Sequence, residues 1–513
     1  MESVTVSSTP RRRPASFDGF VRAHNSALVD GSGRELLLRG VGLGNWMLPE
    51  GYMWRFATGA ESPREIEALT ERLLGAEAAT RFWREFHDGF ITERDIERIA
   101  ASGFDHVRLP INSRVIQSPT GEPIEAGYAM IDRLIEWCRT HELWVLLDLH
   151  GAPGGQTGTN IDDSPRNKPE LFMDARYREL TIDLWRELAT RYAGETVVFG
   201  YDLLNEPLPN EWQYTYADEL VELYRDLTRV IREIDPDHLI VYEGSHWATN
   251  WDIFTEVWDD NSLLQFHKYW SSPDTASIQR FLDTRERLGL PIYMGEGGEN
   301  TPEWIYTAFR LYESHGIGWN FWPWKKIDTV TSPASIVPPE GWDRVIAATN
   351  DPSLEVEDAQ RIFDDLLAAM AIDACDWRGD VVSALTSANP SVIPAWGFGT
   401  RGAGESYSSA AASTIEGIRD ADRVSLAWAT PGDNPPNPFE QSDGRRYRPE
   451  EELVVHLESG DWLEFELDEA DVHGVRVPGA EGATIVERSA RGIRVIATAP
   501  ATVSRLVWGE PRS

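Results

Sequence analysis

Two glutamates follow apolar stretches of this sequence at points where a strand would end. Glu206 comes directly after the apolar run Val198–Leu204 and Asn205, and Glu296 ends a second run that begins at Leu290. Polar side chains at the carboxyl ends of parallel strands meet at one face of a barrel. Two carboxylates in that position can serve as a general acid and a nucleophile, which is the pair that hydrolysis of a glycosidic bond requires.

The elements around these glutamates alternate between short apolar segments and helical patterns. Strands that alternate with helices predict a parallel α/β sheet, and eight such units favour closure into a (β/α)8 TIM barrel. The predicted strands are Leu37–Gly42, His106–Pro110, Trp144–Leu149, Val198–Leu204, Leu239–Glu243, Leu263–His267, Ile292–Gly295 and Gly318–Phe321. Apolar residues at three- and four-residue spacing predict helices over Ile91–Ser102, Ala126–Thr140, Ala175–Tyr192, Tyr216–Ile234, Thr275–Leu288, Pro302–Ser314 and Glu355–Ile372. Residues 248–261 are expected to be irregular.

The chain of 513 residues is longer than one ordinary domain. We expect residues 1–15 to be disordered, because they are rich in Ser, Thr, Pro and Arg and have no periodicity. Residues 16–375 would form the catalytic barrel. Residues 376–513 would form an all-β sandwich, since short apolar runs alternate there with stretches rich in Gly, Pro, Ser and Asn.

Three further segments lie outside the regular barrel pattern. A hairpin is predicted before the first barrel strand, with Asp30–Gly33 as the turn between Phe20–Leu28 and Glu35–Leu38. The insertions Gly51–Ala79 and Thr329–Thr349 are long enough to wall off a pocket at the barrel mouth, although they could also be simple surface excursions.

Charge and composition narrow the classes of partner. The chain has 84 acidic and 48 basic residues and a net charge of -36, which argues against binding to nucleic acid. No run of about 18 apolar residues predicts a membrane span. The first 20 residues include arginines but no apolar core after them, so we expect no secretory signal and a cytoplasmic protein. The two cysteines, Cys138 and Cys375, are not expected to form a disulfide.

Polar or aromatic side chains also accompany most of the other predicted strands. Arg108 lies in the second strand, His150 follows the third, His267 and Tyr269 follow the sixth, and Trp322 follows the eighth. Each residue alone is more often a packing or capping group than a functional one. Because a barrel brings these strand ends to one face, we expect the set to converge on the two glutamates.

This set of residues resembles the signature of glycoside hydrolase family 5, within the larger clan of barrel glycosidases. The resemblance covers residues 20–370 and implies a retaining mechanism, in which Glu206 is the acid/base and Glu296 is the nucleophile. It also implies substrate-binding or supporting roles for the other matching positions, which are Arg108, His150, Asn205, His267, Tyr269 and Trp322.

The chemistry gives each of these positions a physical reason. Glu296 must be ionised to attack, so a nearby Arg108 should lower its pKa and Tyr269 should donate a hydrogen bond to it. The remaining residues would bind the sugar and support the acid/base: the 2-hydroxyl at Asn205, the apolar ring face at Trp322, and other hydroxyls and the acid/base network at His150 and His267.

The stretch from Gly42 to Glu50 resembles the exo-β-1,3-glucanase and rutinosidase-like branch of the family. In that branch a glutamate at the position of Glu50 grips the outer hydroxyls of a terminal glucose. Residues 148–156 are also similar to that branch. Pro49 and the sequence Gly295–Gly298 depart from its usual pattern, so the resemblance indicates the reaction and not the identity of the sugar.

Together these observations predict a retaining, exo-acting β-glycosidase that acts on a β-linked oligosaccharide or small glycoside without a cofactor or metal. A β-glucosidase or exo-β-glucanase fits best, followed by a disaccharide-releasing diglycosidase and then by an endo-β-glucanase or β-mannosidase. Two other classes remain open: a sugar-binding module without activity, and a metal-dependent hydrolase with ligands among Asp148, His150, Glu206, His267 and Glu296. The sequence does not indicate an oligomeric state.

Overall fold

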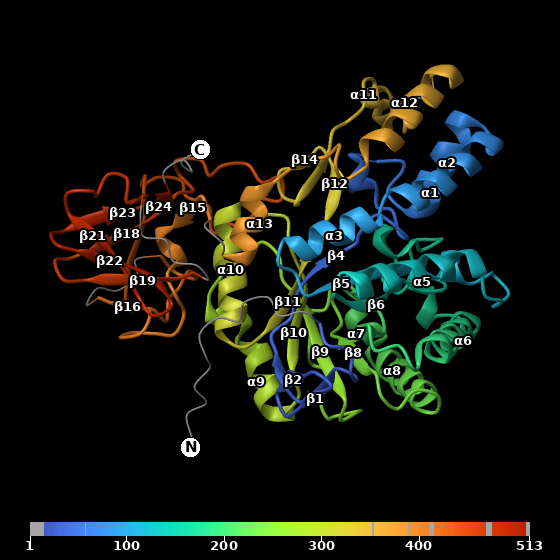
Figure 1. The fold of residues 1–513 in the computed structure, drawn as a ribbon, viewed down its shortest axis with the longest axis horizontal. Coiled ribbons are helices and arrows are strands. Elements are labelled where there is room, and N and C mark those ends of the chain that lie inside the picture. Colours follow the sequence, from blue (N-terminus) through green and yellow to red (C-terminus); the bar gives the residue numbers. More distant parts are fainter. Residues whose placement is uncertain are drawn as a thin grey trace.

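The computed structural model of the protein describes residues 15–508 except for 57, 351–352, 388–389, 410–414 and 468–473. The predicted disorder of residues 1–15 lies outside the described residues, apart from residue 15. Within the described part, eight parallel strands close into a barrel (Figure 1). All eight predicted strands are confirmed; they are β4 Arg39–Gly42, β5 His106–Asn112, β6 Trp144–Gly151, β7 Val198–Asp202, β8 Leu239–Glu243, β9 Ser262–His267, β10 Ile292–Gly298 and β11 Gly318–Trp322.

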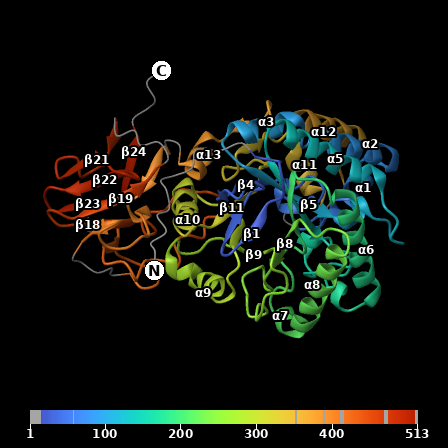
Figure 2. The same ribbon diagram turned by 60° about the horizontal axis from the view of Figure 1, so that its bottom comes forward.

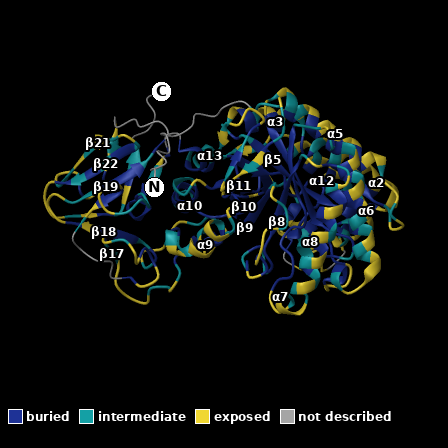
Figure 3. Cartoon of the chain, turned by 90° about the horizontal axis from the view of Figure 1, so that it is seen from below, coloured by how far each residue is buried: buried dark blue, intermediate teal, exposed yellow. Residues whose placement is uncertain are grey.

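Amphipathic helices surround the barrel and bury their apolar faces against it. Figure 3 shows buried strands inside and exposed helix faces outside. The predicted helices are all present: α3 Glu93–Ala101, α5 Glu125–Thr140, α6 Ala175–Tyr192, α8 Ala217–Arg232, α9 Gln279–Leu288, α10 Pro302–Ser314 and α12 Val356–Ala369. Short helices and 3-10 turns in the loops are α4 Ser113–Ile116, α7 Trp212–Thr215, η2 Asn160–Asp162, η3 Glu170–Phe172 and η4 Thr275–Ile278. Residues 248–261 contain no helix, as predicted. None of the described helices is long and apolar enough to cross a lipid bilayer.

A small antiparallel sheet closes the amino-terminal end of the barrel. It consists of β1 Arg22–His24, β2 Ala27–Val29 and β3 Glu35–Leu36. The predicted turn after Asp30 is present between β2 and β3. The prediction of one strand over Phe20–Leu28 was wrong, because Asn25 adopts a left-handed backbone with φ of 54° and a tight turn there makes two strands. Val21 and Leu28 pack on apolar residues at the beginnings of the barrel strands, so the opposite, carboxyl end remains for a site.

The two insertions form a helical layer beside the barrel mouth (Figure 2). The first contains η1 Gly51–Trp54, α1 Pro63–Leu74 and the start of α2 Ala76–Gly89, and both helices pack on α12. The second contains β13 Ala334–Ile336, which pairs with β12 Lys325–Ile327, and α11 Trp342–Ala347. The indole N–H of Trp342 donates to the carbonyl of Trp54 at 3.0 Å, which joins the two insertions.

The carboxyl-terminal part consists of three small sheets beside the barrel, with strand orders β15-β24-β20, β16-β19-β22-β21 and β17-β18-β23 in the described residues. It begins with β14 Asp376–Trp377, which pairs with β13, and with α13 Gly379–Thr386. Its other elements are β15 Val392–Pro394, η5 Ala395–Gly397, β16 Tyr407–Ser408, β17 Ser425–Trp428, β18 Leu453–Leu457, β19 Trp462–Glu466, β20 Val475–Arg476, β21 Thr484–Arg488, β22 Gly492–Ala497, β23 Ala501–Val503 and β24 Arg505–Trp508.

Helix α10 lies between the barrel and these sheets (Figure 1). It begins at Pro302, and the hydroxyl of Thr301 accepts from the backbone N–H of Trp304, which caps the helix. Residues 304–312 are all buried, because the barrel covers one side of the helix while α13, β15 and η5 cover another. The hydroxyl of Tyr306 donates to the carbonyl of Glu466 at 2.7 Å. A helix that is buried on all sides needs both neighbours.

We therefore expect a chain that ends at residue 387 to be less stable than the full protein. Loss of the sheets exposes the outer face of α10, and the midpoint of thermal unfolding should fall by more than about 5 °C, with increased aggregation. Differential scanning calorimetry of both chains measures the change. An equal midpoint for the barrel transition would show that the barrel does not depend on the sheets.

Candidate active site

The carboxyl ends of the barrel strands bring the predicted site residues together. Most of them are buried, and Tyr269 is half-buried. Arg108, His150, His267, Glu296 and Trp322 belong to β5, β6, β9, β10 and β11, and the others stand in the loops that follow β4, β7 and β9, namely Glu50, Asn205, Glu206 and Tyr269.

The two predicted catalytic glutamates face one another across the mouth. A carboxylate oxygen of Glu206, one of Glu296 and a ring nitrogen of His267 all lie within 4.8 Å of one another. The backbone of Glu206 is left-handed, with φ of 44°. Its N–H donates to Oε2 of Glu243 at 2.7 Å, which holds the turn at the end of β7. The backbone of Glu206 therefore helps to fix the direction of its side chain.

A fully buried arginine connects the strands beneath these glutamates. Nη1 of Arg108 donates to Oε2 of Glu296 at 2.9 Å, and Nη2 donates to Oδ1 of Asn205 at 2.9 Å. The same guanidinium forms ion pairs with three further buried carboxylates, which are Asp148 at 3.2 Å, Asp202 at 2.9 Å and Glu243 at 3.1 Å. A buried charge needs such partners, because it has lost its hydration.

Glu296 receives a second hydrogen bond from Tyr269, whose hydroxyl donates to Oε1 at 2.8 Å. This contact agrees with the sequence-based expectation. Arg108 does act to lower the pKa of Glu296, as expected, but the net shift is upward. Burial, together with the charge of Glu206, raises the pKa of Glu296, although His267 and Arg108 act in the opposite direction.

His267 links Glu206 to a carboxylate that sequence reasoning did not select. Its Nδ1 lies 2.7 Å from Oε1 of Glu206, and its Nε2 lies 3.2 Å from Oε1 of Glu243. Burial lowers the pKa of His267, but Glu243, Glu296 and the hydrogen bonds to Glu206 and Glu243 raise it well above its ordinary value. His267 is therefore an imidazolium that donates to both glutamates, and its charge helps to keep the pKa of Glu243 below its ordinary range.

His150 has the opposite protonation. Burial and the charge of Arg108 lower the pKa of His150 to about 4, so the ring is neutral. Its Nδ1 lies 2.7 Å from Oδ2 of Asp148, which places the ring proton there. The other nitrogen is left to accept from the amide of Asn205 at 3.3 Å. The Asn205 amide is thus oriented at both ends, by Arg108 and by His150.

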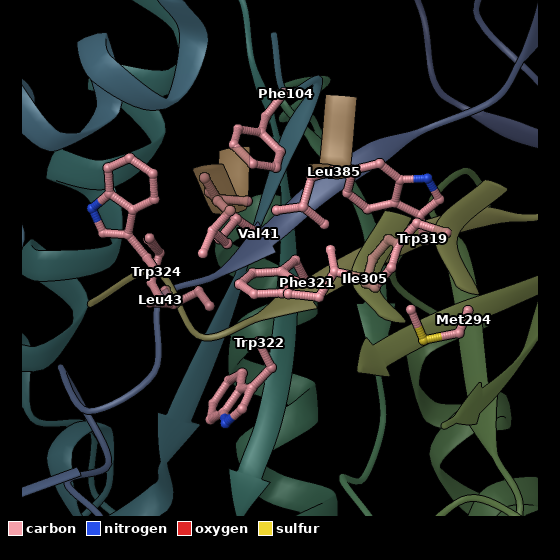
Figure 4. Close-up of a cluster of buried hydrophobic side chains, with 14 of the residues drawn as sticks. Val41, Leu43, Phe104, Met294, Ile305, Trp319, Phe321, Trp322, Trp324 and Leu385 are labelled. Carbon is pink, nitrogen blue, oxygen red and sulfur yellow. The ribbon is translucent and has the colours of Figure 1, made fainter. Parts of the chain in front are cut away.

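Trp322 lies at the edge of the apolar cluster that includes Val41 and Phe321 (Figure 4). Its indole stacks on His150, with ring centroids 5.4 Å apart and planes 9° apart. A Cβ added at Gly42 would lie 2.5 Å from the indole, and one at Gly44 would lie 2.7 Å from it. The glycines of the Gly42–Gly44 stretch therefore allow the chain after β4 to pass directly beside this ring.

Glu50 is buried, with 4% of its surface exposed. Burial, followed by the charges of Glu296, Glu299 and Glu206, raises the pKa of Glu50 well above its ordinary value. Among the described residues, its Oε1 has no hydrogen-bond partner. An acceptor that is buried without a partner is available to a ligand.

Sequence reasoning missed several polar residues of the site. Asp202, Glu243 and Gln265 lie inside predicted apolar strands, and Nε2 of Gln265 donates to both acids, at 2.9 and 2.5 Å. A charged or amide side chain inside a buried strand was the available signal, because such a group requires a partner within the barrel. Tyr52, Glu299 and Lys326 at the mouth carried no comparable signal.

One group of described residues has the spacing of a metal-ligand set, namely Glu206, His267 and Glu296. The hydrogen bonds of this group favour proton transfer over metal binding. His267 would have to lose the proton that it donates to Glu206, whereas a metal ligand must be a neutral imidazole. Glu296 already has a cation at Arg108.

The comparisons with known proteins agree with this geometry. Residues 71–328 match the family model described as cellulase, glycosyl hydrolase family 5. The chain belongs to glycosyl hydrolase family 5. It is therefore a glycoside hydrolase whose class of substrate is carbohydrate. The resemblance that the sequence predicted is confirmed at the level of the family.

The proteins to which this chain is similar have names that describe different activities. A beta-xylosidase of Phanerodontia chrysosporium is 29% identical over 60% of this chain and 71% of its own length. Endoglucanase C of Acetivibrio thermocellus is 35% identical over 48% of this chain and 88% of its own. A probable glucan 1,3-beta-glucosidase A of Emericella nidulans is 31% identical over 55% of this chain and 73% of its own. The crystal structure of rutinosidase from Aspergillus niger is similar to 57% of this chain and 90% of its own, with a TM-score of 0.46 and 18% identity.

We expect Glu243→Gln to weaken the site without abolishing the fold. Loss of this anion leaves Arg108 and His267 short of one partner, so the pKa of His267 should fall and unfolding should become easier by about 3 kcal/mol. Because the folded state raises the pKa of His267, this stabilisation is complete below about pH 6.5 and is lost as the pH rises through the folded value. The difference in melting temperature from wild type should therefore narrow in alkaline buffer.

The control for this prediction is Asp237→Asn, which breaks an ion pair with Arg22 at the other end of the barrel and should leave the His267 titration unchanged. The His267 pKa is measured by NMR in both variants. An unchanged His267 titration in Glu243→Gln would show that Glu243 does not hold the imidazolium.

Proposed function

We propose that this protein is a retaining exo-β-glycosidase, with Glu296 as the nucleophile and Glu206 as the acid/base. The approach of one oxygen of Glu206 and one oxygen of Glu296 to within 4.8 Å carries this proposal. Retaining glycosidases place their carboxyl groups about 5–5.5 Å apart, whereas inverting enzymes leave about 6.5–9.5 Å for a water molecule. The different partners of the two acids support the assignment of their roles.

The partners of Glu296 suit a nucleophile. Arg108 and Tyr269 hold one oxygen each, at 2.9 and 2.8 Å, which fixes the carboxylate and favours its charge. In the first step Glu296 attacks the anomeric carbon and forms a glycosyl ester, while Glu206 gives its proton to the departing oxygen. Two carboxyl groups this close are most stable when they share one negative charge, and ester formation removes that charge from Glu296.

The partners of Glu206 suit a group that changes its protonation. Its Oε1 faces the imidazolium of His267, which stabilises the carboxylate left after proton donation. In the second step Glu206 takes a proton from water, and the water attacks the ester with retention of configuration. Asn205 is oriented by Arg108 and His150 and would bind the sugar 2-hydroxyl. This hydrogen bond would strengthen as the oxocarbenium-like transition state forms.

Burial of the site supports exo attack. Glu206 is 9% exposed and Glu296 is 6% exposed, which fits a closed pocket better than an open groove along a polymer. Tyr52, from the first insertion, accepts a hydrogen bond from the indole of Trp322 at 2.9 Å. The sugar is proposed to be glucose, as in a β-glucosidase or exo-β-glucanase, and a disaccharide-releasing diglycosidase is the second candidate.

Azide rescue tests the roles of the two acids. Glu206→Ala should lose about 10²–10⁴-fold in rate on a substrate with a poor leaving group. On an activated aryl glycoside, whose leaving group needs no proton, azide should attack the glycosyl ester, restore turnover and give a β-glycosyl azide. Glu296→Gly should lose all hydrolysis. The product configuration is read by NMR. The control is Asp328→Asn, which removes an exposed acid and should keep wild-type rates. An α-glycosyl azide from Glu206→Ala would show that the two roles are reversed.

The mass of the released sugar tests the mode of attack. Aryl β-glucoside and aryl β-rutinoside are compared side by side by mass spectrometry, and we expect hexose from the glucoside only. An intact disaccharide, with little activity on the glucoside, would replace this proposal with the diglycosidase. Internal cleavage of a long β-glucan before any glucose appears would replace it with an endoglucanase.

A further inference from the structure

A second polar pair lies at the barrel mouth, next to the residues considered above. The carboxylate of Glu299 bonds the ammonium of Lys326, and the side chains are only 11% and 10% exposed. Glu299 follows Glu296 by three residues and has a left-handed backbone, with φ of 46°. Lys326 lies in β12, after the last barrel strand. The buried ion pair of Glu299 and Lys326 therefore lies at the rim, beside the proposed nucleophile.

The neighbouring lysine shows that this orientation is specific. Lys325 and Lys326 are consecutive in β12, so their side chains leave opposite faces of the strand. Lys325 is buried in the body of the protein, where it pairs with Asp95 at 2.9 Å. Lys326 instead reaches the mouth, where its ammonium lies 5.3 Å from the ring centroid of Tyr52. Only the second lysine is placed to meet a substrate.

Residues of the barrel and of the carboxyl-terminal part together hold the backbone of Glu299 in place. The indole N–H of Trp270 donates to the carbonyl of Glu299 at 3.0 Å. Asn437, from the loop between β17 and β18, donates its side-chain amide to the carbonyl of Trp270 at 2.8 Å. The carboxyl-terminal part thus contacts Trp270, the residue that bonds the backbone of Glu299. Through this contact it supports the rim of the site.

A third ionisable residue of the site is Glu50, whose Oε1 has no hydrogen-bond partner within the described protein. The charges that act on Glu50 are the carboxylates of Glu296, Glu299 and Glu206 and, in the opposite sense, the ammonium of Lys326. Lys326 and Glu299 are therefore among the charged groups that act on Glu50. An ammonium has three donors and a carboxylate about four acceptor positions, so the pair can make further hydrogen bonds.

We propose that Glu299 and Lys326 bind hydroxyls of the terminal sugar on the side away from the anomeric carbon and so set the glycone specificity of the enzyme. This inference rests on the proposed exo-glycosidase function. A neutral sugar with adjacent hydroxyls satisfies both partners, since each hydroxyl donates to the carboxylate or accepts from the ammonium. The three carboxylates around Glu50 disfavour a sugar that carries a carboxylate or phosphate.

A cycle of variants and deoxygenated substrates tests the pair. Glu299→Gln and Lys326→Met are compared with wild type on the aryl β-glycoside that wild type cleaves fastest, and on its 4-deoxy, 6-deoxy (for a hexose) and 2-deoxy forms. Each variant should lose about 10- to 100-fold in kcat/KM on the parent substrate. On the 4-deoxy or 6-deoxy form that lacks the bound hydroxyl the loss should shrink to less than about 3-fold, because the contact is already absent.

Two controls accompany the cycle. The 2-deoxy substrate lacks a hydroxyl assigned to Asn205, so both variants should show their full loss on it. Asp328→Asn removes an exposed ion pair with Arg55 at the same rim and should match wild type on every substrate. Glu299→Gln keeps the size of the side chain, so it decides the test by itself if Lys326→Met does not fold.

The outcomes separate the inference from the function on which it rests. Equal losses on the parent and on all deoxy forms would show that the pair only supports the structure, and would overturn the inference while the glycosidase function stands. The inference would also be overturned if the loss in kcat/KM shrank only on the 2-deoxy substrate and stayed full on the 4-deoxy and 6-deoxy substrates. A wild-type protein that is inactive on aryl β-glucosides, xylosides, mannosides and rutinosides would overturn both.

Discussion

The buried charge of Arg108 is the interaction on which the rest of the site depends. Its guanidinium is fully buried and contacts carboxylates from four different strands, together with the amide of Asn205. Removing a cation of this kind would leave several buried acids without the positive charge that they share, which costs far more than any single contact contributes. The strand ends are therefore fixed relative to one another by charge as well as by backbone hydrogen bonds.

This network gives two chemically identical acids different surroundings. Glu296 is held by a permanent cation and a phenol, whereas Glu206 faces an imidazolium whose charge depends on Glu243. The two histidines differ in the same way. His150 is neutral beside Arg108, and His267 is charged among glutamates. Burial and the charges of this network thus give the two histidines opposite protonation.

The fold was largely predictable because the barrel is coded locally. Each strand is a short apolar run, each helix has an apolar face, and the order of the elements alone predicts closure. The missed elements have different reasons. Helix α1 begins with Ser62-Pro-x-Glu65, a capping sequence that was legible, and the N–H of Ser62 does donate to Glu65 at 3.1 Å. The turn at Asn25 depends on a left-handed residue within an apolar run, which hydropathy does not show.

The sequence by itself determined the barrel, the family and the position of both glutamates, because strand order places every strand end on one face. Only the tertiary structure decided how these groups are charged and which distant residues join them. Burial outweighed the expected effect of Arg108 on the pKa of Glu296, since desolvation depends on everything packed around the carboxyl. Glu299, Lys326 and Asn437 are far apart in sequence and meet at the rim only through folding. No local pattern encodes such contacts.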